Sequence, residues 1–443
     1  MRKFLLPLGL AAQLFNPVFA QTLTAAPADA VGNDNSPPLL VHKATVWSLA
    51  DSVQRIHDIA PELRTAEAEI AAREAELEQA DVWPNPTVDI RADNRLGIED
   101  GSGGSGLTQF ALSQPLPLRR LVRQRAVAEA NLDSARENLR NQQLLLEREV
   151  ARAFHALQLA EAKRQLSLER LQLVAEPPGI ARKKSADGLV RYLTPLERQR
   201  LAILSEEASQ AAVTAEREQQ KALIDFRALL ALQDGAPVKL TKIAPPQTPA
   251  SLDVYVRALD THPALAAARK QSEAAQAGIA VAESQRYADP SLNLFRERDF
   301  LAGQRRDVTG IGVSVQIPLW NNSSGLVAKA GADAGRAQAQ LATMQRNAYS
   351  SLAQAHFQLV RLLEQTERLR VNLLEPAREV YALTRRGFGA GELNVLTLVD
   401  AYNTYFDAHT RHLQLQQESA LAAADLRLAA GISVIDFPKE VAP

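Results

Sequence analysis

The sequence is poor in several residue types on which common protein classes depend. Its 443 residues contain no cysteine, two methionines and only 5% aromatic residues. The absence of cysteine excludes disulfide scaffolds, thiolate metal sites, cysteine nucleophiles and a lipid-modified N-terminal cysteine. The net charge of -1 offers no basic excess, so no nucleic-acid partner is expected.

Long hydrophobic runs are also scarce. The segment from Phe4 to Phe15 is mostly apolar, follows Met1-Arg2-Lys3 and precedes a cleavage pattern that ends at Ala20. It predicts a signal peptide over residues 1–20 rather than a membrane anchor, because the run is too short to span a bilayer. Residues 21–44 are expected to form a flexible leader. An exported chain without a spanning helix is expected in the periplasm, outside the cell, or in a membrane as β-strands.

The length alone favours about three domains of about 150 residues each, but internal repetition favours two halves. Pro61 and Pro263 each precede a stretch rich in alanine, and Pro117 and Pro318 each precede a very long helical pattern. These landmarks recur at nearly constant separation, which predicts a duplication. The expected parts are a first repeat over 45–242 with a β-hairpin at 86–117, a linker at 243–250, a second repeat over 251–435 with a hairpin at 290–318, and a tail at 436–443.

The long helical patterns place alanine and leucine three or four residues apart, which is typical of coiled coils. A helix from about Leu118 to Val174 would be roughly 85 Å long at 1.5 Å per residue. Helix-breaking patches are expected at Glu176-Pro177-Pro178 and at Glu375-Pro376. The helices alone fit a coiled-coil rod as well as a tunnel.

The predicted strands favour the tunnel. Val308 to Pro318 alternates between apolar and small or polar residues over the length of a transmembrane β-strand. Four strands per chain cannot close a barrel, whereas three chains would supply twelve. The alternative is that each hairpin caps a soluble coiled coil.

This layout resembles the TolC-like outer membrane efflux protein family. The resemblance rests on the duplicated order of elements, on Trp83-Pro84-Asn85-Pro86 after the first helix, and on the segment from Gly387 to Ala401. It implies a mostly α fold with transmembrane β: a trimeric, twelve-stranded outer membrane β-barrel continued by a long coiled-coil α-helical periplasmic tunnel. It further implies the passive exit duct of a tripartite pump, not an enzyme, and no cofactor. The implied partners are outer membrane lipid, a periplasmic adaptor (membrane fusion) protein and an inner-membrane resistance-nodulation-division pump.

The substrate is a separate question. The short hairpin loops and the missing lipid-anchor cysteine resemble the heavy-metal cation branch of the family, of the cobalt-zinc-cadmium type. The alternatives are a drug-efflux or type I secretion channel and, more remotely, a soluble periplasmic coiled-coil adaptor. An adaptor should carry one helical hairpin flanked by extended β-domains, whereas this chain predicts two hairpins and only short strands.

The resemblance places a gate between Phe388 and Ala401. Asp400 stands where the family can place a constricting carboxylate, Thr397 where a second acid can occur, and Leu393 where an arginine can occur. Three Asp400 side chains around an axis would form a ring that favours cations. The simpler interpretation is an acid near a helix start, where the helix dipole favours it. Glu197, 203 residues earlier, is a weaker candidate.

Gly188 and Gly391 are expected at the two helix-turn tips, where glycine readily ends a helix. The resemblance implies that these tips also contact the adaptor. His409 and His412 are three residues apart and could share a helix face, but two histidines alone are a weak pattern, and no metal site is predicted.

Overall fold

The computed structural model describes residues 46–92, 108–175, 183–184, 190–191, 194–233, 235, 237–301 and 304–436. The predicted signal peptide, the leader, Gly188 and the patch at Glu176-Pro177-Pro178 lie outside these ranges. The chain divides into two units, Met1–Lys43 and Ala44–Pro443, and the description below concerns the second unit.

The first half of this unit runs from two short helices through a hairpin to two long helices. Its elements are β1 (Val46–Trp47), α1 (Leu49–Ile59), α2 (Pro61–Ala80), β2 (Thr87–Ala92), β3 (Thr108–Pro115), α3 (Arg120–Ala175), β4 (Lys183–Lys184), β5 (Val190–Arg191), α4 (Pro195–Leu229) and β6 (Lys239–Leu240). The expected helix near Leu118 to Val174 is therefore confirmed as α3.

The second half repeats most of this order. Its elements are α5 (Leu252–Ala258), η1 (Leu259–Thr261), α6 (Pro263–Ser284), β7 (Ser291–Leu301), β8 (Gln304–Ser314), α7 (Ser324–Leu369), η2 (Arg370–Leu374), α8 (Glu375–Ala390) and α9 (Val395–Ala429). Pro61 and Pro263 are the first residues of α2 and α6, a position where the missing proline N–H costs nothing.

The expected helix break at Glu375-Pro376 is wrong. The chain stays helical there, because α7 passes into the π-helical turn η2, and α8 begins directly at Glu375. Pro376 has no N–H to donate to the preceding turn. A π turn shifts the hydrogen-bond spacing by one residue, so it accommodates the lost bond without ending the helix.

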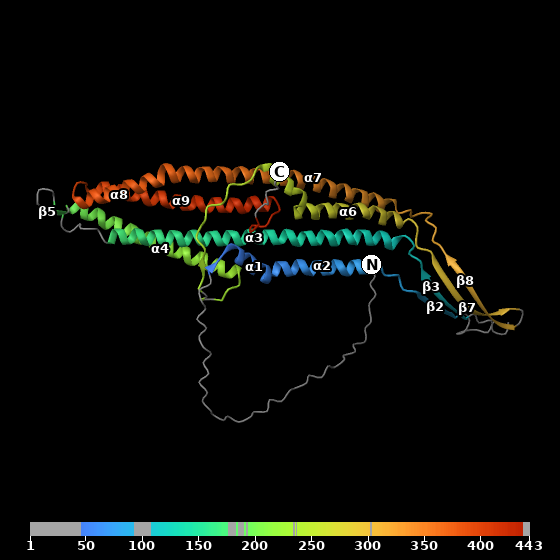
Figure 1. Cartoon of the computed structure of the whole chain (residues 1–443). Coiled ribbons are helices and arrows are strands. Elements are labelled where there is room, and N and C mark those ends of the chain that lie inside the picture. Colours follow the sequence, from blue (N-terminus) through green and yellow to red (C-terminus); the bar gives the residue numbers. More distant parts are fainter. Residues whose placement is uncertain are drawn as a thin grey trace, which may run out of the picture. The chain divides into compact units, whose positions relative to one another are not determined.

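The long helices lie side by side (Figure 1). Helix α3 packs against α2, α4, α6 and α9, and α7 packs against α6 and α9. One core gathers around Val150, Phe154 and Leu157 of α3 with Phe226 of α4. A second core joins Leu352 and Leu359 of α7 to Tyr255 of α5 and Leu426 of α9, among others. Among the described residues, no helix is both long and apolar enough to cross a lipid bilayer.

The two hairpins form a single antiparallel sheet in the order β2-β3-β7-β8. Strand β3 pairs with β7, from Thr108 opposite Arg298 to Pro115 opposite Ser291, and this pairing joins the two halves of the chain. Strand β8 begins at Gln304, four residues earlier than the alternation had indicated. The helices adjoin one end of this sheet, and the end of β7 and the start of β8 lie at the other (Figure 1).

Candidate functional site

One face of the four-stranded sheet is apolar and exposed. Across the sheet, Val88 opposes Leu112, which opposes Leu294, which in turn opposes Ile311. Directly opposed residues lie on the same face, and so do alternate residues along a strand. The exposed large apolar residues of this face are Val88, Ile90, Phe110, Leu292, Leu294, Ile311 and Val313. We call it the apolar face.

The opposite face is polar. It carries Asp89, Gln109, Ser113, Asn293, Glu297 and Ser314, among others. Phe295 and Val308 are apolar exceptions on this face, and the Phe295 ring lies so close over Gly310 that a Cβ at that position would collide with it. The described part of the sheet therefore has the two-faced character of a wall between an apolar and an aqueous phase.

Three exposed aromatic residues mark the junction between the helices and the sheet. Trp83 follows α2, Tyr287 follows α6, and Trp320 lies between β8 and α7. Trp320 is 94% exposed and Tyr287 is 71% exposed. Tryptophan and tyrosine are enriched where a membrane meets water, because one end of the ring is apolar and the other is polar. In the sequence, Trp83 indicates only the end of a helix, and the grouping of the three rings at one level required the structure.

The turn between α8 and α9 is fixed by Gly391 and Phe388. Gly391 has φ 84°, and its N–H donates to the carbonyl of Phe388 at 3.1 Å. The Phe388 side chain is 1% exposed and packs with Val395 of α9 and Leu201 of α4. Phe388, a predicted gate residue, is thus an anchor that holds the end of α8 against two neighbouring helices.

The first turns of α4 and α9 are closed by matching side-chain caps. Thr194 and Glu197 form a capping box, in which the N–H of Thr194 donates to the Glu197 carboxylate at 2.9 Å. At the start of α9, the Asn394 side chain accepts from the N–H of Thr397 at 2.9 Å. Counted from these caps, Glu197 corresponds to Thr397, whereas the sequence offset of 203 had paired it with Asp400.

Asp400 belongs to an exposed polar stripe along α9. The exposed residues of this stripe recur every three or four positions, which places them on one helix face. They are Thr397, Asp400, Thr404, Asp407, Arg411, Gln414 and Glu418. The structure thus brings two predicted gate residues, Thr397 and Asp400, onto one surface, and it leaves Phe388 inside. The recurrence of these polar residues every three or four positions can be recognised in the sequence.

Of the predicted histidine pair, His412 is buried between the helices and His409 is half-buried. Burial lowers the pKa of both His409 and His412, and the Nδ1 atoms of both have no hydrogen-bond partner among the described residues. Tyr405 packs its ring against His409, with centroids 5.8 Å apart. Within the part of the chain that the structure describes, no group of three or more histidine and acidic side chains is placed to hold a metal ion.

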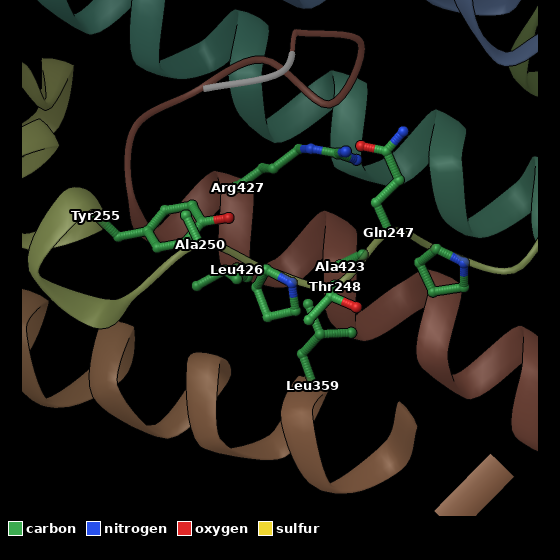
Figure 2. Close-up of a pocket in the computed structure, with 10 residues that line it drawn as sticks. Gln247, Thr248, Ala250, Tyr255, Leu359, Ala423, Leu426 and Arg427 are labelled. Atoms are coloured by element: carbon green, nitrogen blue, oxygen red, sulfur yellow. The ribbon is translucent and has the colours of Figure 1, made fainter. Parts of the chain in front are cut away.

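A pocket lies where the linker between the halves crosses the second core (Figure 2). Pro246 to Ala250 line it together with Tyr255, Leu359, Ala423, Leu426 and Arg427. Figure 2 shows the Arg427 side chain extending toward Gln247. Burial lowers the pKa of the Arg427 guanidinium. The pocket bears a single charged group and no arrangement of acids, bases and nucleophiles suited to catalysis.

Comparison with known proteins identifies the family. The model of the outer membrane efflux protein family matches residues 53–232 and again residues 254–432. The chain therefore belongs to that family, which places it in the outer membrane and among transport proteins rather than enzymes. These findings confirm the resemblance and the location that the sequence indicated.

Individual relatives agree with this assignment. The cobalt-zinc-cadmium resistance protein CzcC of Cupriavidus metallidurans is 25% identical over 96% of this chain and 99% of its own length. The fold is similar to that of VceC from Vibrio cholerae, with TM-score 0.70, 16% identity and coverage of 87% of this chain and 96% of that one. It is also similar to the MtrE channel of Neisseria gonorrhoeae, with TM-score 0.66, 19% identity and coverage of 87% and 89%.

Proposed function

We propose that three copies of this chain form a passive exit duct. Each copy contributes β2, β3, β7 and β8 to a twelve-stranded β-barrel, and the helices continue the duct into the periplasm. The observation that carries the proposal is the exposed apolar face, which seven large side chains share. Within the described residues of one chain nothing covers this face, whereas lipid would cover it in a barrel wall.

The sheet edges support the same assembly. Strands β2 and β8 each pair on one side only within the described residues. Unpaired strand edges are not tolerated in lipid, because their N–H and C=O groups lack partners there. Pairing β8 of one copy with β2 of the next would satisfy both edges and close the sheet.

The helices supply further contact surface between copies. Several large apolar residues on α4 and on the continuous α7–α8 helix remain exposed in the single chain. On α4 they include Leu196, Ile203, Val213 and Ile224. On the α7–α8 helix they include Met344, Tyr349, Phe357, Val380 and Leu383. Exposed apolar residues on α4 and on the α7–α8 helix favour association of the chain with further copies of itself.

We propose the boundaries of the two repeats as the sequence indicated them, with repeats over 45–242 and 251–435, a linker over 243–250 and a tail over 436–443. The two segments matched by one family model lie inside these ranges and support the duplication. Strands β2 and β3 fall within 86–117, and β7 and β8 fall within 290–318.

For the substrate we propose heavy-metal cations. The full-length similarity to a cobalt-zinc-cadmium resistance protein supports this choice. Drug efflux and type I secretion are the alternatives that the fold accommodates equally. A soluble coiled-coil adaptor fits poorly, because the exposed apolar face would lie in water.

For the gate we propose a ring of Asp400 side chains at the start of α9, with Thr397 one turn earlier and Glu197 near the matching end of α4. The partners proposed for the duct are a periplasmic adaptor, received at the tips near Gly188 and Gly391, and an inner-membrane resistance-nodulation-division pump. The exposed polar stripe of α9 supports a water-filled interior next to this ring.

Cell fractionation and metal tolerance test the proposal. The full chain should be recovered from the outer membrane, and in detergent it should migrate as a trimer when unheated. A soluble monomer from the periplasm would refute the duct. A deletion strain should lose tolerance to zinc, cobalt and cadmium. Loss of tolerance to a drug panel, with metal tolerance unchanged, would refute the metal assignment and leave the duct standing.

A further inference from the structure

The apolar face ends in a charged cluster near the end of β7 and the start of β8. Arg296 and Arg298 follow Leu294 at alternate positions of β7, and Asp307 lies opposite Arg298 on β8. The alternation places all three on the same face as Leu294 and Ile311. We call these three residues the tip cluster. It lies toward the end of β7 and the start of β8, whereas α6 and α7 adjoin the other ends of these two strands.

One carboxylate holds both guanidinium groups of the tip cluster. Arg298 donates from Nε to Oδ1 of Asp307 at 2.8 Å and from Nη2 to Oδ2 at 3.3 Å. Arg296 donates from Nη2 to Oδ2 at 3.0 Å. The carboxylate balances only one of the two positive charges. The two arginine side chains remain 67% and 54% exposed, so donors are left over for another anion.

We propose that the tip cluster binds the phosphate group of an anionic membrane lipid. This inference rests on the proposed function, because it requires the apolar face to contact lipid. An arginine on the lipid side of a barrel is costly at the bilayer midplane and tolerated near the interface. The tip cluster therefore marks the level of the lipid headgroups at the outer end of the apolar face.

The neighbouring side chains suit a lipid better than a free ion. Phe110 and Thr309 oppose Arg296 on its two sides, in β3 and β8. Planar guanidinium groups bind phosphate through paired hydrogen bonds, and the threonine hydroxyl can add another. The 49% exposed Phe110 ring and the apolar rows below it offer contact for an acyl chain, which inorganic phosphate does not have.

Lipid retention by the purified full chain tests the proposal. The protein is prepared in a maltoside detergent, which has no phosphate, and mixed with a phosphorylated glycolipid such as lipid A or with its dephosphorylated form. Native mass spectrometry then counts the lipid retained. The Arg296→Gln/Arg298→Gln double variant should bind the phosphorylated form roughly thirtyfold more weakly, since each surface cation contributes about a factor of five. The dephosphorylated form should bind both proteins equally weakly.

Arg306→Gln is the matched control. Arg306 lies beside Asp307 in β8, so its loss removes the same charge from the opposite face. Retention by this variant should equal that of the wild type. Three outcomes would each overturn the inference. They are an equal loss of lipid retention in both variants, unchanged lipid retention in the double variant, and displacement of the lipid by inorganic phosphate at comparable concentration.

Conductance in planar bilayers separates this inference from the proposed function. Wild type and double variant should both conduct in bilayers of neutral lipid. If both proteins conduct and the double variant retains as much lipid as the wild type, only the lipid site at the tip cluster is overturned. Absence of conductance from the wild type overturns the duct and the lipid site together.

Discussion

Gly391 ends α8 with a backbone conformation that strains every residue with a Cβ. Its φ of 84° lies in the left-handed region, so Gly391→Ala should lower the free energy of unfolding by about 1 kcal/mol. Gly389 is the control, because it lies inside α8 with no atom near an added Cβ. Gly389→Ala should raise stability by up to about 1 kcal/mol. Denaturant midpoints of the two variants in detergent measure the difference, and shifts of the same sign would contradict this role of Gly391.

Asp400 lies on the exposed stripe of α9 close to the turn, and Asp407 lies two helical turns further along the same stripe. If Asp400 forms the narrow ring, Asp400→Asn should lower the cation selectivity of single channels clearly more than Asp407→Asn. A charge at a constriction acts on every passing ion, whereas a charge on a wider wall is screened by water and salt. Reversal potentials in a salt gradient measure the effect. Equal shifts of the reversal potential in the two variants would contradict a selective ring at Asp400.

His409 and His412 make stability depend on pH. Burial lowers the pKa of both below the usual histidine value of about 6.5, so the unfolded chain binds their protons more readily than the folded chain does. Their contribution is fully present above about pH 6.5 and is lost as the pH falls through the folded pKa values. The thermal midpoint should therefore drop between about pH 7 and pH 5. The charged groups around the pair are Glu169, Glu367, Arg370 and Arg378.

His409→Gln/His412→Gln should flatten part of that drop. Burial lowers the pKa of His155 and His262 in the same direction, so a smaller pH dependence should remain in the double variant. An unchanged slope in the double variant would contradict the assignment to this pair.

At the scale of elements, the start of α4 shows how one acid can serve two purposes. Glu197 completes the capping box with Thr194, and by its position it is also a candidate for the ion path. Thr194→Ala should lower stability by about 1 kcal/mol, because an N-cap hydrogen bond is lost. Glu197→Gln retains the box, since glutamine serves at this position as well as glutamate, and so should leave stability nearly unchanged.

The Glu197→Gln variant therefore separates the effect of the Glu197 charge on ion passage from its role in capping α4. A change in cation selectivity without a change in the unfolding midpoint would assign Glu197 to the ion path. Unchanged selectivity would leave it with the capping role alone. Thr194→Ala serves as the reference for a purely structural defect.

At the scale of the whole molecule, the decisive property is the difference between the two faces of the sheet. Ile311 is 75% exposed in the apolar face, so Ile311→Lys should reduce membrane insertion and the yield of unheated trimer. A lysine facing lipid near the bilayer midplane costs about 2–4 kcal/mol. Ser314→Lys places the same charge on the polar face of the same strand and should be tolerated. Comparable losses in both variants would contradict the assignment of the faces.

The repeated order of helices and strands could be predicted from the sequence because it depends on local patterns. Pro61 and Pro263 begin matching helices, and the alternation before Pro318 indicates a strand. The continuity of the helix through Glu375-Pro376 could not be predicted in this way, because a π turn and a helix break share the same proline signal. The pairing of Glu197 with Thr397 also required the structure, since the offset between the repeats changes with the length of their turns.

The sequence by itself determined the periods: heptad-like spacing for the helices, alternation for the strands, and duplication for the whole. These depend on residues close together in the chain, so they can be read without coordinates. Only the tertiary structure decided which surfaces are free. It buried Phe388, exposed the stripe with Asp400, and joined the hairpins through β3 and β7 into a single sheet with one apolar face. Exposure depends on neighbours that are distant in the chain, and a period shows that a face exists but not what covers it.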